Sequence, residues 1–149
     1  MTQEDKQLLL KDLCARLPYG VYMHHKNFPE ANLKLSAVFS DNRIGVKQNE
    51  IGLTPTSINE CKPYLRPLSS MTEEELRELN DKYGSIAYFF IQEPPYYHGL
   101  QAQHSDIGSI EISEFSEIYD WLNAHHFDYR GLIEKGLALE APEGMYKAK

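Results

Sequence analysis

The sequence has few cysteines and no long hydrophobic run. Its two cysteines, Cys14 and Cys61, are not spaced as a metal-binding or redox pair and offer no disulfide framework. No apolar run approaches the roughly 18 residues that a membrane-spanning helix needs. The longest apolar stretch near the start, Leu8–Leu10, is too short for the core of a signal peptide. These absences predict a soluble protein of the cytoplasm.

Recognisable catalytic and cofactor motifs are also missing. There is no GxSxG turn for a nucleophile, and the nine glycines are scattered rather than gathered in a phosphate-binding loop. Cys14 lies in a leucine-rich helical pattern, where a free cysteine is expected to be a small buried hydrophobe. His24 and His25 fall in a predicted strand, so only one of them could join a site. The sequence predicts no catalytic residue and no cofactor.

The net charge is concentrated in one segment. The chain carries 15 Lys and Arg against 22 Asp and Glu, a formal net charge of −7. Between Glu93 and Asp128 there are seven acidic residues and no Lys or Arg, so this segment accounts for the whole net charge. Binding to a nucleic-acid backbone needs clustered Lys and Arg, and the sequence shows no such cluster. We therefore expect no nucleic-acid partner.

Length and composition predict one domain spanning residues 1–149. A domain of 149 residues is near the commonest size and should bury about 68–70% of the surface of its unfolded chain. The hydrophobic share of 42% is ordinary for a globular protein. Neither an internal repeat nor a linker divides the chain. The core should therefore form without a disulfide or a structural metal.

Hydrophobic patterning predicts a helix followed by a β-meander. Thr2 can cap the helix, with Asp5 at the reciprocal capping-box position, and leucines spaced four residues apart form its apolar stripe. From Gly20 to about Leu53 the apolar period becomes two, with a turn at Asp41–Asn42. This pattern predicts three or four antiparallel strands with one face covered.

The central part of the chain predicts a connection, a helix and a strand pair. Thr54–Leu68 contains three prolines and is expected to be a connection with at most one helical turn. A second helix should follow, because Thr72 and Glu75 match a capping box. Ser85–Gln92 is apolar on both faces and predicts a central strand, with Ile107–Ile112 as its antiparallel partner.

The C-terminal part predicts two further helices. One runs from about Glu114 to His126, and Asp128 can cap a short one that ends near Gly136. The fold expected from all these elements is α+β. It consists of an N-terminal helix, an antiparallel curved or barrel-like sheet of five or six strands, and two C-terminal helices packed on that sheet.

Three stretches of the chain carry a resemblance to a known family. They are Lys11–Val21, Lys62–Glu75 and Trp121–Tyr146, which together make about a third of the sequence. They resemble a family of small uncharacterised proteins from gut anaerobic bacteria, their prophages and mobile elements. The middle section, Tyr22–Asn59, is not part of the resemblance. It implies a bacterial or phage cytoplasmic setting, and since the family has no assigned activity it transfers no catalytic residue.

An acidic and aromatic surface within residues 93–128 is the first functional hypothesis. Glu93–Asp106 is a fourteen-residue connection between predicted strands, longer than a hairpin needs, and long loops are often functional. Its tyrosines, stiffened by two prolines, offer large contact area at low entropy cost, although they could equally fold back as a lid. The expected function is a non-enzymatic protein-interaction module with a basic partner. The predicted contact residues are Tyr96, Tyr97, His98, Asp106, Glu114, Glu117 and Asp120.

The histidines offer an alternative function as a metal-binding protein or a metal-dependent enzyme. They lie in the same acidic segment, and imidazole and carboxylate groups are common metal ligands. The His125–Asp128 stretch matches no familiar ligand spacing, and its structural interpretation is a helix end followed by an Asp cap and a helix restart. A structural subunit of a larger assembly is a third alternative. The alternative metal ligands are His98, His104, His125, His126 and Asp128.

Overall fold

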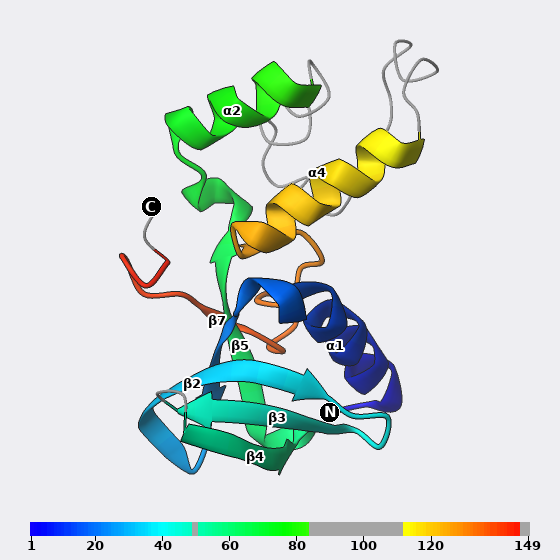
Figure 1. The fold of residues 1–149 in the computed structure, drawn as a ribbon, viewed down its shortest axis with the longest axis vertical. Coiled ribbons are helices and arrows are strands. Elements are labelled where there is room, and N and C mark those ends of the chain that lie inside the picture. Colours follow the sequence, from blue (N-terminus) through cyan, green and yellow to red (C-terminus); the bar gives the residue numbers. More distant parts are fainter. Residues whose placement is uncertain (49–50, 84–111, 147–149) are drawn as a thin grey trace. The chain divides into compact units, whose positions relative to one another are not determined.

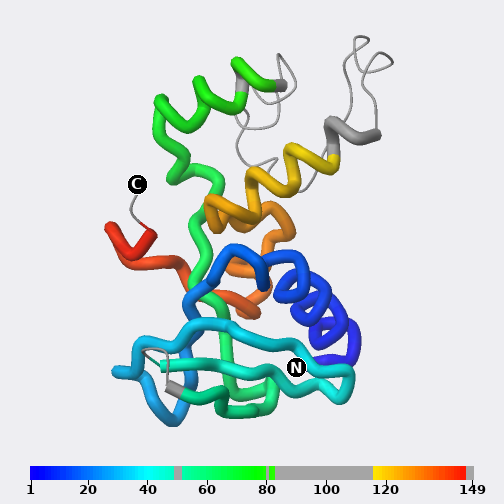
Figure 2. The backbone as a smooth tube through the Cα atoms, in the orientation of Figure 1, coloured from blue at the N-terminus to red at the C-terminus, as the bar shows by residue number. Residues whose placement is uncertain are grey.

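The structure is a computed structural model that describes residues 1–48, 51–83 and 112–146 (Figures 1 and 2). The chain forms two compact units. The first, which we call the sheet unit, is Met1–Leu65 with Leu132–Lys149, and the second, the helical unit, is Arg66–Gly131. The single domain expected from the chain length stays a prediction. Within the described ranges, no helix is long and apolar enough to cross a membrane.

The sheet unit begins with helix α1, Gln3–Arg16. Its predicted cap is confirmed, because the Thr2 hydroxyl accepts a hydrogen bond from the Asp5 amide at 3.0 Å while the Asp5 carboxylate accepts one from the Thr2 amide at 3.2 Å. Bonds of this kind satisfy amides that the helix start leaves unpaired. A 3₁₀ turn, Leu17–Tyr19, follows, and Gly20 ends it at φ 72°, a conformation that favours glycine.

Helix α1 buries both an apolar stripe and an ion pair. Leu9 and Leu13 are fully buried, as the leucine spacing predicts. Cys14 is exposed, so the prediction that it is a buried hydrophobe is wrong; one residue beyond Leu13, the helix has turned by about 100° away from the core. Asp12 and Arg16 are also fully buried, and the Arg16 Nε donates to the Asp12 carboxylate at 2.7 Å. Their i, i+4 spacing lets the two charges pair within one helix.

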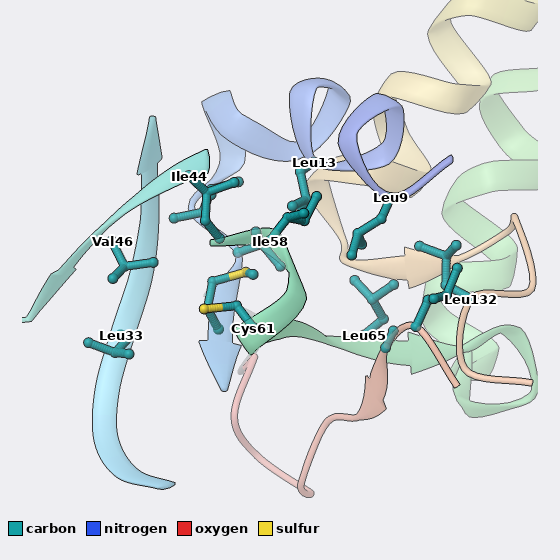
Figure 3. Packing of buried hydrophobic residues seen from close by; sticks show 14 residues of the cluster. Leu9, Leu13, Leu33, Ile44, Val46, Ile58, Cys61, Leu65 and Leu132 are labelled. Carbon is teal, nitrogen blue, oxygen red and sulfur yellow. The ribbon is translucent and has the colours of Figure 1, made fainter. Parts of the chain in front are cut away.

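The predicted antiparallel meander is confirmed. Its strands are β1 Tyr22–His25, β2 Phe28–Val38, β3 Arg43–Gln48 and β4 Ile51–Ser57, each antiparallel to the next (Figure 1). Asn42 takes the left-handed conformation, with φ 64°, in the turn between β2 and β3. Figure 3 shows the buried side chains of this unit gathered between α1 and the sheet. The labelled ones are Leu9, Leu13, Leu33, Ile44, Val46, Ile58, Cys61, Leu65 and Leu132.

A strand forms where the prolines predicted a connection. β5, Cys61–Pro67, follows the short 3₁₀ turn Ile58–Glu60 and pairs antiparallel with β1. Its burial alternates from Cys61 onward, so every second side chain enters the core. Proline is compatible with a sheet wherever the ladder requires no donor from its nitrogen, and Pro55 lies in β4, an edge strand of the sheet. The prediction of a connection over Thr54–Leu68 is therefore wrong.

The sheet is mixed and open rather than antiparallel and barrel-like. Its seven strands follow the order β4-β3-β2-β1-β5-β6, and β7, Leu139–Glu140, also pairs with β5. Both β7 and β6, Phe127–Asp128, are parallel to β5. Parallel pairing requires a long crossover, and about sixty residues separate β5 from β6. The α+β class and the N-terminal helix are confirmed, while the barrel-like antiparallel sheet of five or six strands is wrong.

The helical unit contains helices α2, Glu73–Tyr83, and α4, Ile112–Ala124. The predicted capping box of α2 is confirmed, since Thr72 and Glu75 exchange two hydrogen bonds of 3.1 Å. Helix α4 is the predicted third helix, beginning and ending two residues earlier than expected. The two predicted strands, Ser85–Gln92 and Ile107–Ile112, lie outside the described residues apart from Ile112, which begins α4.

The predicted fourth helix does not form. Asp128 lies in β6 opposite Pro67, so its backbone is extended and paired in the sheet instead of capping a helix. Residues 132–136 form turns, in which the amides of Leu137 and Ala138 both donate to the Leu132 carbonyl. Leu132 and Leu137 are buried by these turns. Of the two predicted C-terminal helices, the described residues contain only α4.

Candidate functional site

The predicted contact surface is described only in part. Tyr96, Tyr97, His98 and Asp106 lie outside the described residues, so the tyrosine loop stays a prediction. Glu114 belongs to α4 by its backbone position.

The remaining two predicted contact residues lie on the outer side of α4. Glu117 and Asp120 are exposed, whereas Ile118 and Leu122 are buried. The carboxylates therefore form the solvated side of an amphipathic helix. In the part of the chain that the structure describes, neither carboxylate takes part in an ion pair. Two like charges three residues apart on a helix repel each other, so a positive charge placed beside this side of α4 would be stabilising.

Trp121 fixes α4 within the helical unit. The residue is only 6% exposed, and its indole N–H donates to the Glu78 carboxylate of α2 at 3.3 Å. The ring also stacks on His125, with centroids 4.0 Å apart, and on Phe127 at 5.9 Å. A buried aromatic ring with a satisfied polar atom holds a helix firmly. The outer carboxylates of α4 are consequently presented on a fixed support.

Arg66 contacts both the Glu75 carboxylate and the Phe127 ring. Its guanidinium makes two bonds of 2.7 Å to the Glu75 carboxylate and lies over the Phe127 ring at 4.2 Å. Burial would raise the pKa of Glu75, but hydrogen bonds from Arg66 and from Thr72 outweigh it and hold the pKa below its usual value. One of the four basic residues of the helical unit is thereby committed to an internal carboxylate.

The residues of the metal alternative are separated in role. The His125 ring bonds through Nδ1 to the Trp121 carbonyl at 2.9 Å, which is the predicted stabilisation of a helix end. His126 follows in the left-handed conformation, and Asp128 is buried in β6. Among the described residues, no three His, Cys, Asp or Glu side chains form a group that could hold a metal ion. His98 and His104 lie outside those residues, so the metal alternative stays a prediction.

A polar network at one edge of the sheet unit was not predicted. His25 is buried, and its Nε2 lies 3.0 Å from the Thr56 hydroxyl and 3.4 Å from the Glu60 carboxylate. The Asn27 amide donates to His25 Nδ1, which places the proton of the neutral ring on Nε2. Burial raises the pKa of the neighbouring Cys61 thiol to about 11. Cys61 is therefore a protonated core thiol, which argues against a nucleophilic role.

The sheet unit also has a basic and aromatic face that the sequence did not reveal. Tyr22, Lys34 and Lys47 lie opposite one another on β1, β2 and β3, and therefore point to the same side. His24 pairs with Lys62 of β5 on that side. Contacts within the face are the Lys34 ammonium over the Tyr22 ring at 5.4 Å and an edge-on contact of His24 with Tyr64. We call these six residues the lysine face: Tyr22, His24, Lys34, Lys47, Lys62 and Tyr64.

The lysine face depends on an irregularity of the β2–β3 pairing. Near the turn, Val38 pairs with Ile44 and Ala37 with Gly45, and continuing this register would place Lys34 opposite Gln48. A bulge between Leu35 and Ala37 shifts the pairing by one residue and brings Lys47 opposite Lys34 instead. Alternation alone could have assigned each lysine to the outer side of its strand. Their juxtaposition follows only from the bulge.

The two units divide the charge unequally. The helical unit contains four basic and twelve acidic residues, a net charge of −8. The sheet unit contains eleven basic and ten acidic residues, a net charge of +1.

Comparison with known proteins gives no further assignment: no family model, no curated protein and no solved structure matches this chain.

Proposed function

We propose that the protein is a non-enzymatic protein-interaction module whose acidic helical unit binds a basic surface of a partner protein. The observation that carries this proposal is the outer side of α4, where Glu117 and Asp120 are exposed and form no ion pair among the described residues. A surface of one charge sign favours a partner of the opposite sign and speeds the encounter with it.

The support beneath these carboxylates favours binding over simple solvation. Because Trp121 is held by Glu78 and by two ring contacts, α4 can present its charges without being ordered first. A preorganised surface binds at a lower entropic cost than a flexible one. Most of the negative charge of the helical unit is also left over after the Arg66–Glu75 pair is counted.

The proposed surface extends, by sequence, to the other predicted contact residues. Tyr96, Tyr97 and His98 would add aromatic contact area, and Asp106 and Glu114 would add negative charge. The resemblance of its sequence to proteins of gut bacteria and their phages supports a bacterial cytoplasmic setting for the proposed module. A host protein is then a fitting target.

The test is a pull-down with the tagged full chain from nuclease-treated bacterial lysate, read by mass spectrometry. The test variant is Glu117→Lys with Asp120→Lys, and the matched control is Glu30→Lys with Glu143→Lys, two exposed acids of the sheet unit. We expect a stoichiometric partner with the native chain and the control, and at least a tenfold loss with the test variant, since two attractive contacts become repulsive. Equal capture by all three proteins would refute the proposal.

A further inference from the structure

The lysine face contains an unfavourable arrangement that no carboxylate of the described residues relieves through an ion pair. Lys34 and Lys47 lie directly opposite each other on neighbouring strands, both exposed, where like charges destabilise the pairing. Within the described residues, no carboxylate forms an ion pair with Lys34, Lys47 or Lys62. A local arrangement that costs stability without internal compensation is expected where a protein makes an external contact.

The same chain carries a complementary arrangement on its other unit. Glu117 and Asp120 are exposed three residues apart on α4, and such residues have Cβ atoms about 5–6 Å apart. The Cβ atoms of directly opposite residues in an antiparallel pair, such as Lys34 and Lys47, are about 4.5–5.5 Å apart. The acidic pair and the basic pair thus have matching spacing. Each is repulsive alone, and both repulsions are relieved when the pairs meet.

We propose that the Lys34–Lys47 pair of one molecule docks on the Glu117–Asp120 pair of a second copy of this chain. The inference rests on the proposed function, since it names one basic partner for the outer side of α4. The contact joins the sheet unit of one copy to the helical unit of the next, so it is head-to-tail. Without any other partner, the chain therefore forms dimers and then longer oligomers as its concentration rises.

The lysine face fits an acidic protein surface better than a nucleic acid. Single-stranded nucleic acids need free aromatic faces on which bases stack. Here the Tyr22 ring is already approached by Lys34 at 5.4 Å and by Tyr146 at 5.4 Å. Tyr146 is itself fixed in place, because its hydroxyl accepts from the Tyr22 amide and donates to the Tyr64 carbonyl, both at 2.8 Å. With its ring so engaged, Tyr22 contributes contact area instead of a stacking platform.

Sedimentation velocity of the full chain over increasing concentration tests the proposal. We expect association of the native chain that weakens between 0.05 M and 0.5 M salt, because the Debye length falls from about 14 Å to about 4 Å. Lys34→Glu with Lys47→Glu, and separately Glu117→Lys with Asp120→Lys, should each lower the association constant about tenfold or more. The control Lys11→Glu with Lys135→Glu, two exposed lysines outside the lysine face, should associate like the native chain.

A mixture of the two variants gives the decisive result. One variant keeps the acidic pair and the other keeps the basic pair, so an equal mixture should form a 1:1 complex that grows no further. Circular dichroism checks that each variant is folded. If Lys34→Glu with Lys47→Glu is unfolded, Lys34→Ala with Lys47→Ala is used in its place. A mixture that stays monomeric, or a native chain that is monomeric at about 1 mM, overturns the inference.

Three further outcomes separate this inference from the function on which it rests. Binding of a single-stranded oligonucleotide that is lost with Lys34→Glu and Lys47→Glu, without self-association, would overturn the second copy as the occupant. Capture of a different protein that requires Glu117 and Asp120, by a chain that never self-associates, would also overturn it and would leave the proposed function intact. Self-association without any other captured protein would support the inference and count against a separate host target.

Discussion

Each of the two units contains, among its described residues, a bidentate arginine–carboxylate pair, and the two pairs differ in burial and in the distance along the chain that they bridge. In the sheet unit, Asp12 and Arg16 pair within one helix and are fully buried. In the helical unit, Arg66 and Glu75 join a strand to a helix cap, with side chains 17% and 13% exposed. The first pair thus keeps two charges inside a core, whereas the second fastens two elements together near the surface.

The outer surfaces of the two units also differ in their exposed charges. The sheet unit is nearly neutral overall but places Lys34 opposite Lys47, and neither lysine forms an ion pair within the described ranges. The helical unit is strongly negative and exposes Glu117 and Asp120 on a helix that Trp121 fixes. In each unit a largely buried arginine is thus paired with a carboxylate, whereas these exposed lysines and carboxylates form no ion pair among the described residues. The overall charge of −7 is thus the sum of a nearly neutral sheet unit and a strongly negative helical unit.

Breaking the buried pair should have the largest effect. Asp12→Ala removes the carboxylate that the buried Arg16 Nε contacts at 2.7 Å, and we expect a loss of about 3–5 kcal/mol in the free energy of unfolding. Urea unfolding followed by circular dichroism measures it. The control is Asp41→Ala, which removes an ion pair to Arg43 whose side chains are 53–55% exposed and should change stability by less than about 1 kcal/mol. Equal effects of the two substitutions would contradict the structural contrast.

The pair of the helical unit should show a pH dependence. Hydrogen bonds from Arg66 and Thr72 hold the pKa of Glu75 below its ordinary value of 4.5, so the folded state favours the carboxylate. The stability that the ionised Glu75 carboxylate adds is present above pH 4.5 and is lost as the pH falls through the pKa of Glu75 in the folded state. We expect Glu75→Gln to cost about 1.5 kcal/mol at pH 7 and much less at pH 3.

The single tryptophan makes this measurement specific to one unit. Trp121 lies in the helical unit, so its fluorescence in urea reports unfolding there. Glu74→Gln, which alters an exposed carboxylate of α2, serves as the control for a general effect of lost charge. A cost of Glu75→Gln that is the same at both pH values would show that the bond to Arg66 does not depend on ionisation.

Thiol labelling should show the smallest effect and reports on the sheet unit alone, because both cysteines lie there. At pH 8 we expect a chromogenic disulfide reagent to label exposed Cys14 and not Cys61, which is buried and has a pKa of about 11. Both should react in urea, and Cys14→Ser should abolish the native reaction. If Cys61 is labelled in urea at the concentration where Trp121 fluorescence changes, the two units unfold together, as the single-domain prediction requires.

The sequence predicted those features that depend on near neighbours along the chain. The caps of α1 and α2 followed from Thr2 with Asp5 and from Thr72 with Glu75, because a capping box closes within three residues. The outer side of α4 followed in the same way from the alternation of acidic and apolar residues. The antiparallel meander was also predictable, since its strands are consecutive and joined by short turns.

Two of the wrong predictions concern residues whose partners are distant in the sequence, and a third concerns one position on a helix. Asp128 was predicted to cap a helix, but it pairs in the sheet with Pro67, a residue distant in the sequence. Strand β5 was missed because its prolines are unfavourable locally, and only its neighbours β1, β6 and β7 show where a missing donor can be tolerated. Cys14 was assigned to the core from its leucine-rich surroundings, although the rotation of one residue along the helix leaves it exposed.

By itself, then, the sequence determined the α+β class, the helix ends, the consecutive strands and the location of the negative charge. Only the tertiary structure decided the parallel pairings of β5, the burial of Asp12 with Arg16, and the meeting of Lys34 with Lys47. The physical reason is range. Caps and amphipathic periods are set by interactions within one or two helical turns, whereas a one-residue bulge or a distant strand changes which side chains meet without leaving a local signal.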